Sequence, residues 1–308
     1  DGIAIVPENP AVRSGGSALA IDTRKGAVVR LTVENNVFGE LGGRSIRLIS
    51  ESGKSGNPAS MNGLYASLIQ HNVFMGGLDL GNAGGGLRIL GNRFYAEHEE
   101  NRSNAIDLHA LSDAEQMIIA YNDFEMPGGA IRVTQGRQIR IMYNKFEQLV
   151  PNTGPEKAMV ALVGTKDEPI ADVFLIGNSM NGHDTNAAHH VYVNHAERIS
   201  FQDNSMGRVK DVHVFLDTDA RNVQFGPRNE FFDAAGKVMP SAAVRDLGRN
   251  TAGIKQNLKL ENGWVNDDSG HYSEAGFYKD SEGVVHLTGV IKDGAAEDGT
   301  IFAELPPG

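Results

Sequence analysis

The chain of 308 residues contains no cysteine, a single tryptophan and only 7% aromatic residues. The absence of cysteine excludes disulfides, thiolate metal ligands and a thiol nucleophile. No apolar run approaches the roughly 20 residues that a membrane-spanning helix needs. Basic residues are also few, with 28 Lys and Arg against 39 Asp and Glu, and the net charge of -11 argues against nucleic acid as the main partner.

Glycine, in contrast, is abundant, with 37 residues, and 40% of the chain is hydrophobic. Many glycines and few long helical patterns favour a β-rich protein with many turns and a large core. Residue 1 is Asp rather than Met, and no signal peptide precedes the first pattern. We therefore expect the chain to be a piece of a longer protein.

A short kernel recurs through most of the sequence. It consists of two apolar residues separated by one other residue, then two spacers, an asparagine, one spacer and a phenylalanine or methionine. Residues 139–146, IRIMYNKF, are one copy. The asparagines are Asn36, Asn72, Asn92, Asn122, Asn144, Asn178, Asn204 and Asn229, and the residues two positions later are Phe38, Phe74, Phe94, Phe124, Phe146, Met180, Met206 and Phe231. A fixed kernel at variable spacing predicts a solenoid whose loops differ while its strands stay stacked.

The kernel alternates with a period of two, which predicts strands. Ile139 and Ile141 should point inward and Arg140 outward, and Asn144 and Phe146 should point inward again after a short corner. A buried asparagine needs hydrogen-bond partners. Stacked turns can supply them from the corner backbone and the next asparagine, so these residues are predicted to be structural. The last repeat is irregular, because Val223 and Phe225 lie one residue out of register.

A second strand follows in most repeats, with apolar residues on both sides of an outward position. Its outward residues are predicted to be Arg47, Asp79, Asp107 with His109, Arg132 with Thr134, Ala161, Tyr192 with Asn194, and His213 with Phe215. Successive turns should stack about 4.8 Å apart, so that these side chains form a column.

Together, the kernel and the second strand resemble the right-handed parallel β-helix of the pectate-lyase-like superfamily, which includes polysaccharide lyases, glycoside hydrolases, epimerases and phage tailspikes. The resemblance covers about residues 25–233 and implies an all-β fold. We predict a parallel β-helix domain over residues 1–249 and a small C-terminal β domain, sandwich-like, over residues 250–308.

The C-terminal segment contains NGWVN, AGFYKDSEGVVHLTGVIK and TIFAELPPG, and its pattern predicts a hairpin around residues 281–283. It is similar to the small β domains that close phage tail-fibre and tailspike proteins. That resemblance implies a virion or extracellular location and a homotrimer. Trp264, with Tyr272 and Tyr278, could form a sugar-stacking platform, but packing in a small core is the favoured interpretation for Trp264.

In the superfamily, the face that corresponds to the outward column is the substrate groove. The resemblance therefore implies a polysaccharide as partner and a catalytic set of His109, Arg132, Tyr192 and Asp107. Arg132 would pair with a uronate carboxylate, and His109 or Tyr192 would move the proton. Substrate contacts are predicted for Arg47, Asp79, Thr134, Asn194, His213 and His190.

Two further roles are possible for Asp79 and Asp107. They could hold Ca²⁺, the one cofactor considered, or act as the acid and base of a hydrolase. The alternative is an exposed ion-pair ladder of Asp79, Asp107 and Arg132 that contributes little to stability.

A second cluster contains His183, Asp184, His189, His190 and His195, and it is either part of the site or a polar surface loop. Its spacing matches no standard zinc motif. His189 and His190 should point to opposite sides of a strand.

No catalytic motif of the superfamily transfers residue by residue. The paired aspartates with a nearby RIK of polygalacturonases and the DPH of alginate epimerases are absent from the sequence. GAIRVTQGRQIRIMYNKF is similar to a segment of alginate-lyase-type β-helices, but Thr134 and Gln135 replace the usual Arg-His pair. We expect a tailspike-type polysaccharide depolymerase, with lyase chemistry ahead of hydrolysis. The alternatives are a non-catalytic glycan-binding tail protein and a secreted bacterial polysaccharide lyase.

Overall fold

The computed structural model describes most of the chain, in separate stretches. They are residues 4–5, 17–24, 26–39, 44–49, 63–95, 104–110, 115–125, 129–147, 156–182, 188–226, 228–232, 244–247, 251–252, 256–267, 275–279, 284–295, 297 and 300–305. His183, Asp184 and Tyr272 lie outside these stretches. No helix in the described stretches has the length and apolar character to cross a membrane.

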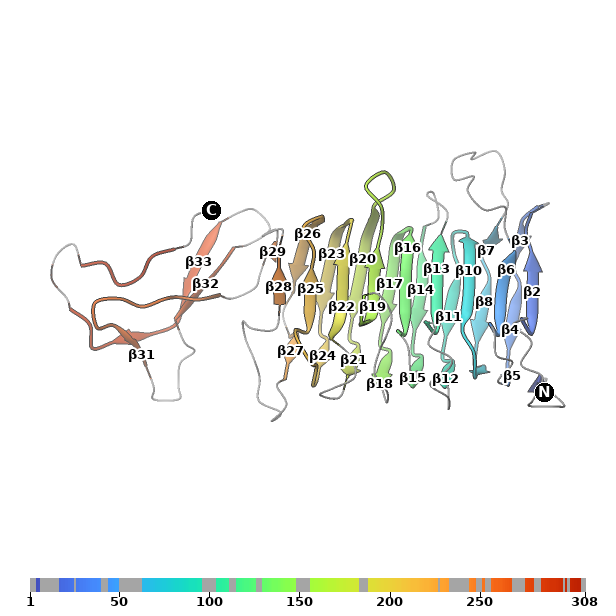
Figure 1. Cartoon of the computed structure of the whole chain (residues 1–308), viewed down its shortest axis with the longest axis horizontal. Coiled ribbons are helices and arrows are strands. Elements are labelled where there is room, and N and C mark those ends of the chain that lie inside the picture. Colours follow the sequence, from blue (N-terminus) through green and yellow to red (C-terminus); the bar gives the residue numbers. More distant parts are fainter. Residues whose placement is uncertain are drawn as a thin grey trace.

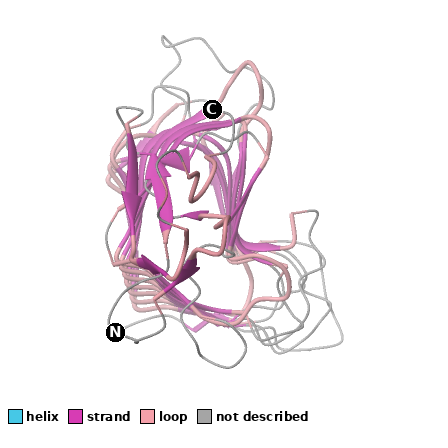
Figure 2. Cartoon of the chain, turned by 90° about the vertical axis from the view of Figure 1, so that its left-hand side faces the viewer, coloured by secondary structure: helices cyan, strands magenta, loops and turns pink. Residues whose placement is uncertain are grey.

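Three parallel sheets run along one rod and enclose its interior (Figures 1 and 2). We call these sheets A, B and C. In a complete coil the chain passes through sheet B, then sheet C, then sheet A. Sheet A contains β1 (Ala4–Ile5), β5 (Val37–Phe38), β9 (Val73–Phe74), β12 (Arg93–Tyr95), β15 (Asp123–Glu125), β18 (Lys145–Glu147), β21 (Ser179–Asn181), β24 (Ser205–Met206) and β27 (Glu230–Phe231).

Sheets B and C have the same parallel order. Sheet B contains β2 (Leu19–Asp22), β6 (Ile46–Ile49), β10 (Leu78–Ala83), β13 (Ile106–Ala110), β16 (Ile131–Gln135), β19 (Ala158–Val163), β22 (His189–Asn194), β25 (Val214–Leu216) and β28 (Val244–Asp246), with β3 (Val28–Val29) and β7 (Leu64–Tyr65) at its side. Sheet C contains β4 (Thr32–Glu34), β8 (Leu68–Gln70), β11 (Arg88–Leu90), β14 (Met117–Ala120), β17 (Arg137–Met142), β20 (Ile170–Ile176), β23 (Ala196–Gln202), β26 (Ala220–Phe225) and β29 (Thr251–Ala252). This architecture confirms the predicted all-β parallel β-helix.

The kernel spans the end of sheet C, one corner and the start of sheet A. As predicted, Ile139 and Ile141 are fully buried, while Arg140 between them is exposed. After the corner, Asn144 and Phe146 are buried again. Alternation alone therefore identified the residues of this strand that lie inside the coil.

Each kernel asparagine bonds to the next coil and to the backbone of the previous one. The Asn122 Oδ1 atom accepts hydrogen bonds from the backbone N and Nδ2 of Asn92, at 2.9 and 3.0 Å. The Asn122 Nδ2 atom donates to the Ile89 carbonyl at 2.9 Å and to Asn144 Oδ1 at 3.0 Å. The same pattern runs from Asn36 to Asn229, so the predicted ladder is confirmed.

The phenylalanines form a second ladder inside sheet A. Their rings stack at centroid distances of 4.8 to 5.1 Å from Phe38 to Phe146. Backbone conformation repeats too, because the residue before each ladder asparagine has positive φ. These residues are Asn35, His71, Gly91, Tyr121, Tyr143, Gly177, Asp203 and Arg228. The corner thus requires a left-handed backbone whatever side chain it carries.

The irregular last repeat keeps its strand in register. Val223 pairs with Ile199, and Phe225 pairs with Phe201 one coil earlier. The Phe225 and Phe201 rings stack at 4.5 Å. One more residue thus separates this strand from its asparagine than in the other repeats.

The last strands leave the parallel pattern. β30 (Gln256–Asn257), β32 (Gly276–Lys279) and β33 (Val285–Thr288) form one antiparallel sheet, and β31 (Val265–Asn266) pairs with β34 (Ile291–Lys292). The predicted hairpin is the β32–β33 pair. Trp264 is half-buried and its ring packs on Gly294, where a side-chain methyl group would overlap it. This contact agrees with a packing role for Trp264.

Candidate functional site

The outer face of sheet B carries one side chain per coil in the predicted column. The strand register places these residues side by side in the order Arg47, Asp79, Asp107, Arg132, Ala161, Tyr192, Phe215 and Arg245. Strand β25 is thus centred on Phe215, not on His213. The column brings together the predicted residues from Arg47 to Arg132.

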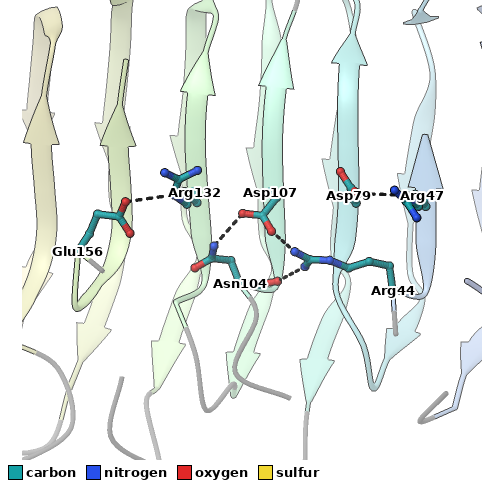
Figure 3. Close-up of polar contacts among 7 residues, drawn as sticks. All are labelled: Arg44, Arg47, Asp79, Asn104, Asp107, Arg132 and Glu156. Atoms are coloured by element: carbon teal, nitrogen blue, oxygen red, sulfur yellow. Dashed lines mark hydrogen bonds and ion pairs between the residues drawn. The ribbon is translucent and has the colours of Figure 1, made fainter. Parts of the chain in front are cut away.

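The charged residues of the column form pairs, but not the pairs expected (Figure 3). Arg47 Nε lies 3.4 Å from Asp79 Oδ2. Asp107 binds Arg44, and Arg132 Nε donates to Glu156 Oε1 at 3.2 Å. The three residues Asp79, Asp107 and Arg132 therefore do not form the predicted ion-pair ladder with one another. Asp79 pairs with Arg47 on the neighbouring coil, whereas Asp107 and Arg132 pair with residues at corners.

Asp107 is held from two sides. Asn104 Nδ2 donates to its Oδ1 atom at 2.7 Å, and the Asn104 carbonyl accepts a hydrogen bond from Arg44 Nη1 at 2.6 Å. Arg44 reaches across the intervening coil because residue 77 is glycine, where any side chain would collide with the guanidinium and with the Asn104 carbonyl. Gly129 makes similar room for the Asn104 amide. The two glycines, which carry no side chain, thus shape this part of the face.

His109 lies beside these pairs, exposed to solvent. Its Nδ1 atom is 2.9 Å from Thr134 Oγ1. A bulge sets this contact, since Leu108 pairs with Val133 but His109 pairs with Gln135, so that Thr134 is the extra residue. Bulges redirect side chains at the edges of functional sites. With Nδ1 engaged, Nε2 is the imidazole atom that remains to meet a ligand.

An open pocket of about 320 Å³ lies among these residues. Four of its polar side chains were predicted to lie in the site, together with Thr134, and Arg44 and Leu108 complete it. Its lining is Arg44, Asp79, Asp107, Leu108, His109, Arg132 and Thr134. Two carboxylates, two guanidinium groups, one imidazole and one hydroxyl therefore converge on one opening.

Tyr192 belongs to a separate part of the same face. Ala161 stands between Arg132 and Tyr192 in the column, and Tyr192 does not line the pocket. Its hydroxyl donates to Asp217 Oδ2 at 2.7 Å. Burial and this carboxylate raise the pKa of Tyr192 well above its ordinary value. A tyrosine so held resists deprotonation, which argues against the proton-transfer role that the sequence suggested.

Tyr192 instead starts a stack of flat groups. Its ring stacks on Phe215 at 5.6 Å, and the Arg245 guanidinium lies 5.7 Å from the centre of the Phe215 ring. Asn194, two residues on, is half-buried.

His190 and His213 are not on the outer face. Their exposed fractions are 0% and 3%, and their rings lie 5.3 Å apart inside the coil, where the chain enters sheet B. Burial, then the neighbouring His213, lowers the pKa of His190 to about 3. Burial also lowers the pKa of His213, whose Nε2 atom is 2.9 Å from the carbonyls of Gly207 and Phe232. Both rings are therefore buried rather than on the outer face, and substrate contact by these two residues stays a prediction that their burial disfavours.

The other histidines of the predicted cluster do not converge. His189 is 9% exposed and its ring lies 5.0 Å from that of Phe215, whereas His195 faces Asp219 at 3.8 Å. No group of three or more His, Asp or Glu side chains suited to a metal occurs in the described stretches. Asp79 and Asp107, the residues considered for Ca²⁺, each face an arginine.

Sequence reasoning missed Arg44, Asn104, Glu156 and Asp217. A signal existed for two of them, because Arg44 precedes Arg47 by three residues and Asn104 precedes Asp107 by the same interval. Residues at one offset from the column share one corner, so both belong to a second column.

Comparison with known proteins adds no relative. No protein-family model, no curated protein and no solved structure matches this chain.

Proposed function

We propose that the outer face of sheet B binds a uronic-acid-containing polysaccharide and that the pocket cleaves it by β-elimination. The observation that carries this proposal is the pocket in which His109 and Arg132 lie together. A base and a fixed cation within one opening are the two groups that elimination from a uronate requires.

Arg132 is the carboxylate partner in this mechanism. Its Nε atom is held by Glu156, which leaves the two terminal nitrogens of the guanidinium for a bidentate contact with the uronate carboxylate. Neutralising that carboxylate acidifies the C5 proton. His109 takes the proton through Nε2, the C4–C5 double bond forms as the C4–O bond breaks, and the leaving oxygen is protonated by water.

The test is the formation of an unsaturated product from uronic-acid polymers, followed by ultraviolet absorbance. We expect His109→Ala and Arg132→Gln to lower kcat/KM by at least about 100-fold, the lower end of the usual range for general acid–base catalysis. Arg93→Gln, a matched change on sheet A and away from the pocket, should retain most of the activity. Circular dichroism must show an unchanged fold. Cleavage of neither acidic nor neutral glycans would refute the proposal.

Binding without cleavage is the second candidate. The specific observation in its favour is that both carboxylates of the pocket already face arginines, a neutral arrangement suited to holding hydroxyl groups. A glycan array with binding and no product would decide for this alternative. Products whose new non-reducing ends are saturated would instead indicate hydrolysis by Asp79 and Asp107.

We also propose a homotrimer of tailspike or tail-fibre type, in a virion or outside the cell. The support is the C-terminal region, where Leu287, Ile301 and Phe302 are 57%, 52% and 40% exposed. Apolar exposure concentrated in one region is typical of subunit contacts. Light scattering tests this point, since a monomer would favour a secreted bacterial lyase.

A further inference from the structure

The outer face of sheet C differs from the other outer faces in its side chains. Its first column reads Leu68, Arg88, Ile118, Arg140, Phe174, Ser200 and Gln224 in the strand register. On the neighbouring corner, Tyr121 and Tyr143 are 65% and 50% exposed, and their rings stack at 5.4 Å. We call Arg88, Ile118, Tyr121, Arg140, Tyr143 and Phe174 the sheet C strip.

The strip is a bounded surface. It occupies four successive coils, from β11 to β20, and the next two coils carry Ser200 and then Gln224 at the position of Phe174. The fold does not require exposed apolar residues here, because the same coil geometry continues with polar ones. Phe174 is 37% exposed, because alternation on sheet C directs its side chain outward, where a polar residue would fit equally well. This confinement is typical of a binding surface.

No carboxylate of the described stretches pairs with either arginine of the strip. Within the described stretches, neither Arg88 nor Arg140 forms an ion pair or a side-chain hydrogen bond. On sheet A, in contrast, Arg93 pairs with Glu125, and on sheet B Arg132 pairs with Glu156. In a chain of net charge -11, unpaired arginines on one strip favour an anionic ligand.

Spacing narrows the ligand to an extended polymer. Arg88 and Arg140 stand two coils apart in one column, which corresponds to roughly 9–10 Å at the inter-strand spacing of parallel sheets. Substituents on one side of an extended glycan chain recur at every second sugar, so a uronate polymer lying along the rod can present carboxylates to both arginines. Exposed aromatic rings beside them supply the apolar contact that sugar rings seek.

We propose that the sheet C strip is a second, non-catalytic binding site for an acidic polysaccharide that lies along the rod. Arg88 and Arg140 bind its carboxylates, and Tyr121, Tyr143 and Phe174 pack on its sugar rings. The strip is on a different sheet from the pocket, so binding there requires no cleavage and goes beyond the proposed function. It would keep a long polymer on the rod between encounters with the pocket.

The experiment measures binding of an oligogalacturonate of six sugars to the full chain by calorimetry. The Arg132→Gln background removes the carboxylate partner of the pocket, so that the strip is read by itself. We expect Arg88→Gln with Arg140→Gln to weaken binding by roughly 25-fold, because each ion pair contributes roughly five-fold and their free energies add. Tyr121→Ala should also weaken binding, and salt should weaken it in the parent protein.

Arg93→Gln is the matched control. It removes one positive charge from the same coil as Arg88, but on sheet A, and it should leave the dissociation constant within about two-fold. A neutral oligosaccharide of equal length should bind more weakly than the acidic one.

Three outcomes would overturn the proposal. They are equal binding by the double variant and its parent, tighter binding of single-stranded DNA of equal charge, and a change of oligomeric state in the double variant, which would mark the strip as a contact between copies of this chain. Whether any unsaturated product forms in the wild-type background depends on the pocket, whatever the strip binds. A failure of the strip is thus distinguishable from a failure of the proposed function.

Discussion

The interior and the outer faces of the same coils follow opposite rules. Inside, position after position repeats one residue type, as in the asparagine ladder and the stacked phenylalanines. Outside, neighbouring coils carry Asp107, Arg132 and Ala161 at one position of the column. Inside, an identical neighbour satisfies each buried polar group, so repetition itself stabilises the rod. Outside, water satisfies polar groups, and each coil is free to carry a different side chain.

The sharpest test of this comparison is a break in the middle of the ladder. Asn122→Ala removes the acceptor of two Asn92 donors and the donor to the Ile89 carbonyl, all of them buried. We expect the free energy of unfolding to fall by at least about 3 kcal/mol, because each orphaned buried group costs about 1–3 kcal/mol. Guanidinium titration measures the change. Asn229→Ala at the end of the ladder should cost less, since water can reach its partners, and equal losses would contradict the ladder argument.

A second test uses acid, to which the interior should be more sensitive than the faces. The ordinary pKa of histidine is 6.5, whereas the pKa of buried His190 is about 3. Between these values the unfolded chain binds a proton that the folded chain excludes. His190 therefore leaves stability intact above pH 6.5 and lowers it progressively as the pH falls toward 3, by on the order of a few kcal/mol.

His190→Met isolates this contribution. One coil earlier, the register places the buried Met159 at the position of His190, so this interior position accommodates a methionine side chain. The variant should lose less stability than the wild type between pH 6.5 and 4 in thermal unfolding. Part of the dependence of stability on pH remains in the variant, because burial also lowers the pKa of His189 and of His213. Parallel stability curves for the two proteins would exclude His190 as a source of acid sensitivity.

The smallest effect is expected on sheet A. Lys145 lies 3.0 Å from Glu147 and 3.7 Å from Asp123, but its side chain is 54% exposed. Lys145→Gln should change the free energy of unfolding by less than about 0.5 kcal/mol, because solvent and salt screen exposed ion pairs. A loss of several kcal/mol in denaturant titration would show that the outer faces, like the interior, hold the rod together.

Much of the fold could be predicted from the sequence because burial repeats. The kernel around Asn144 identified the inward residues, the corner and the ladder, and the hairpin of β32 and β33 followed from alternation around a turn. The column from Arg47 to Arg132 also followed, since stacking in register brings equal positions together. The division of the chain at residue 249 stays a prediction, and the parallel pairing continues to Thr251 and Ala252 in β29.

The partners within the site could not be predicted. Arg44 reaches Asp107 across a coil through the space left by Gly77, and a bulge sets Thr134 against His109. The sequence places His213 outside because His213 alternates with Phe215. His213 precedes the strand, however, and its side chain turns inward at the corner. Corner geometry and small register shifts decide such contacts, and neither has a strong sequence pattern.

By itself, the sequence determined that the chain coils, which residues line the coil and which positions meet along the rod, because hydrophobic alternation and the needs of a buried amide act locally and repeat. Only the tertiary structure decided which opposite charges pair, which histidines are buried and where an opening forms. Those outcomes depend on the lengths and directions of individual side chains from different coils, and such side chains are close only after the coils have stacked.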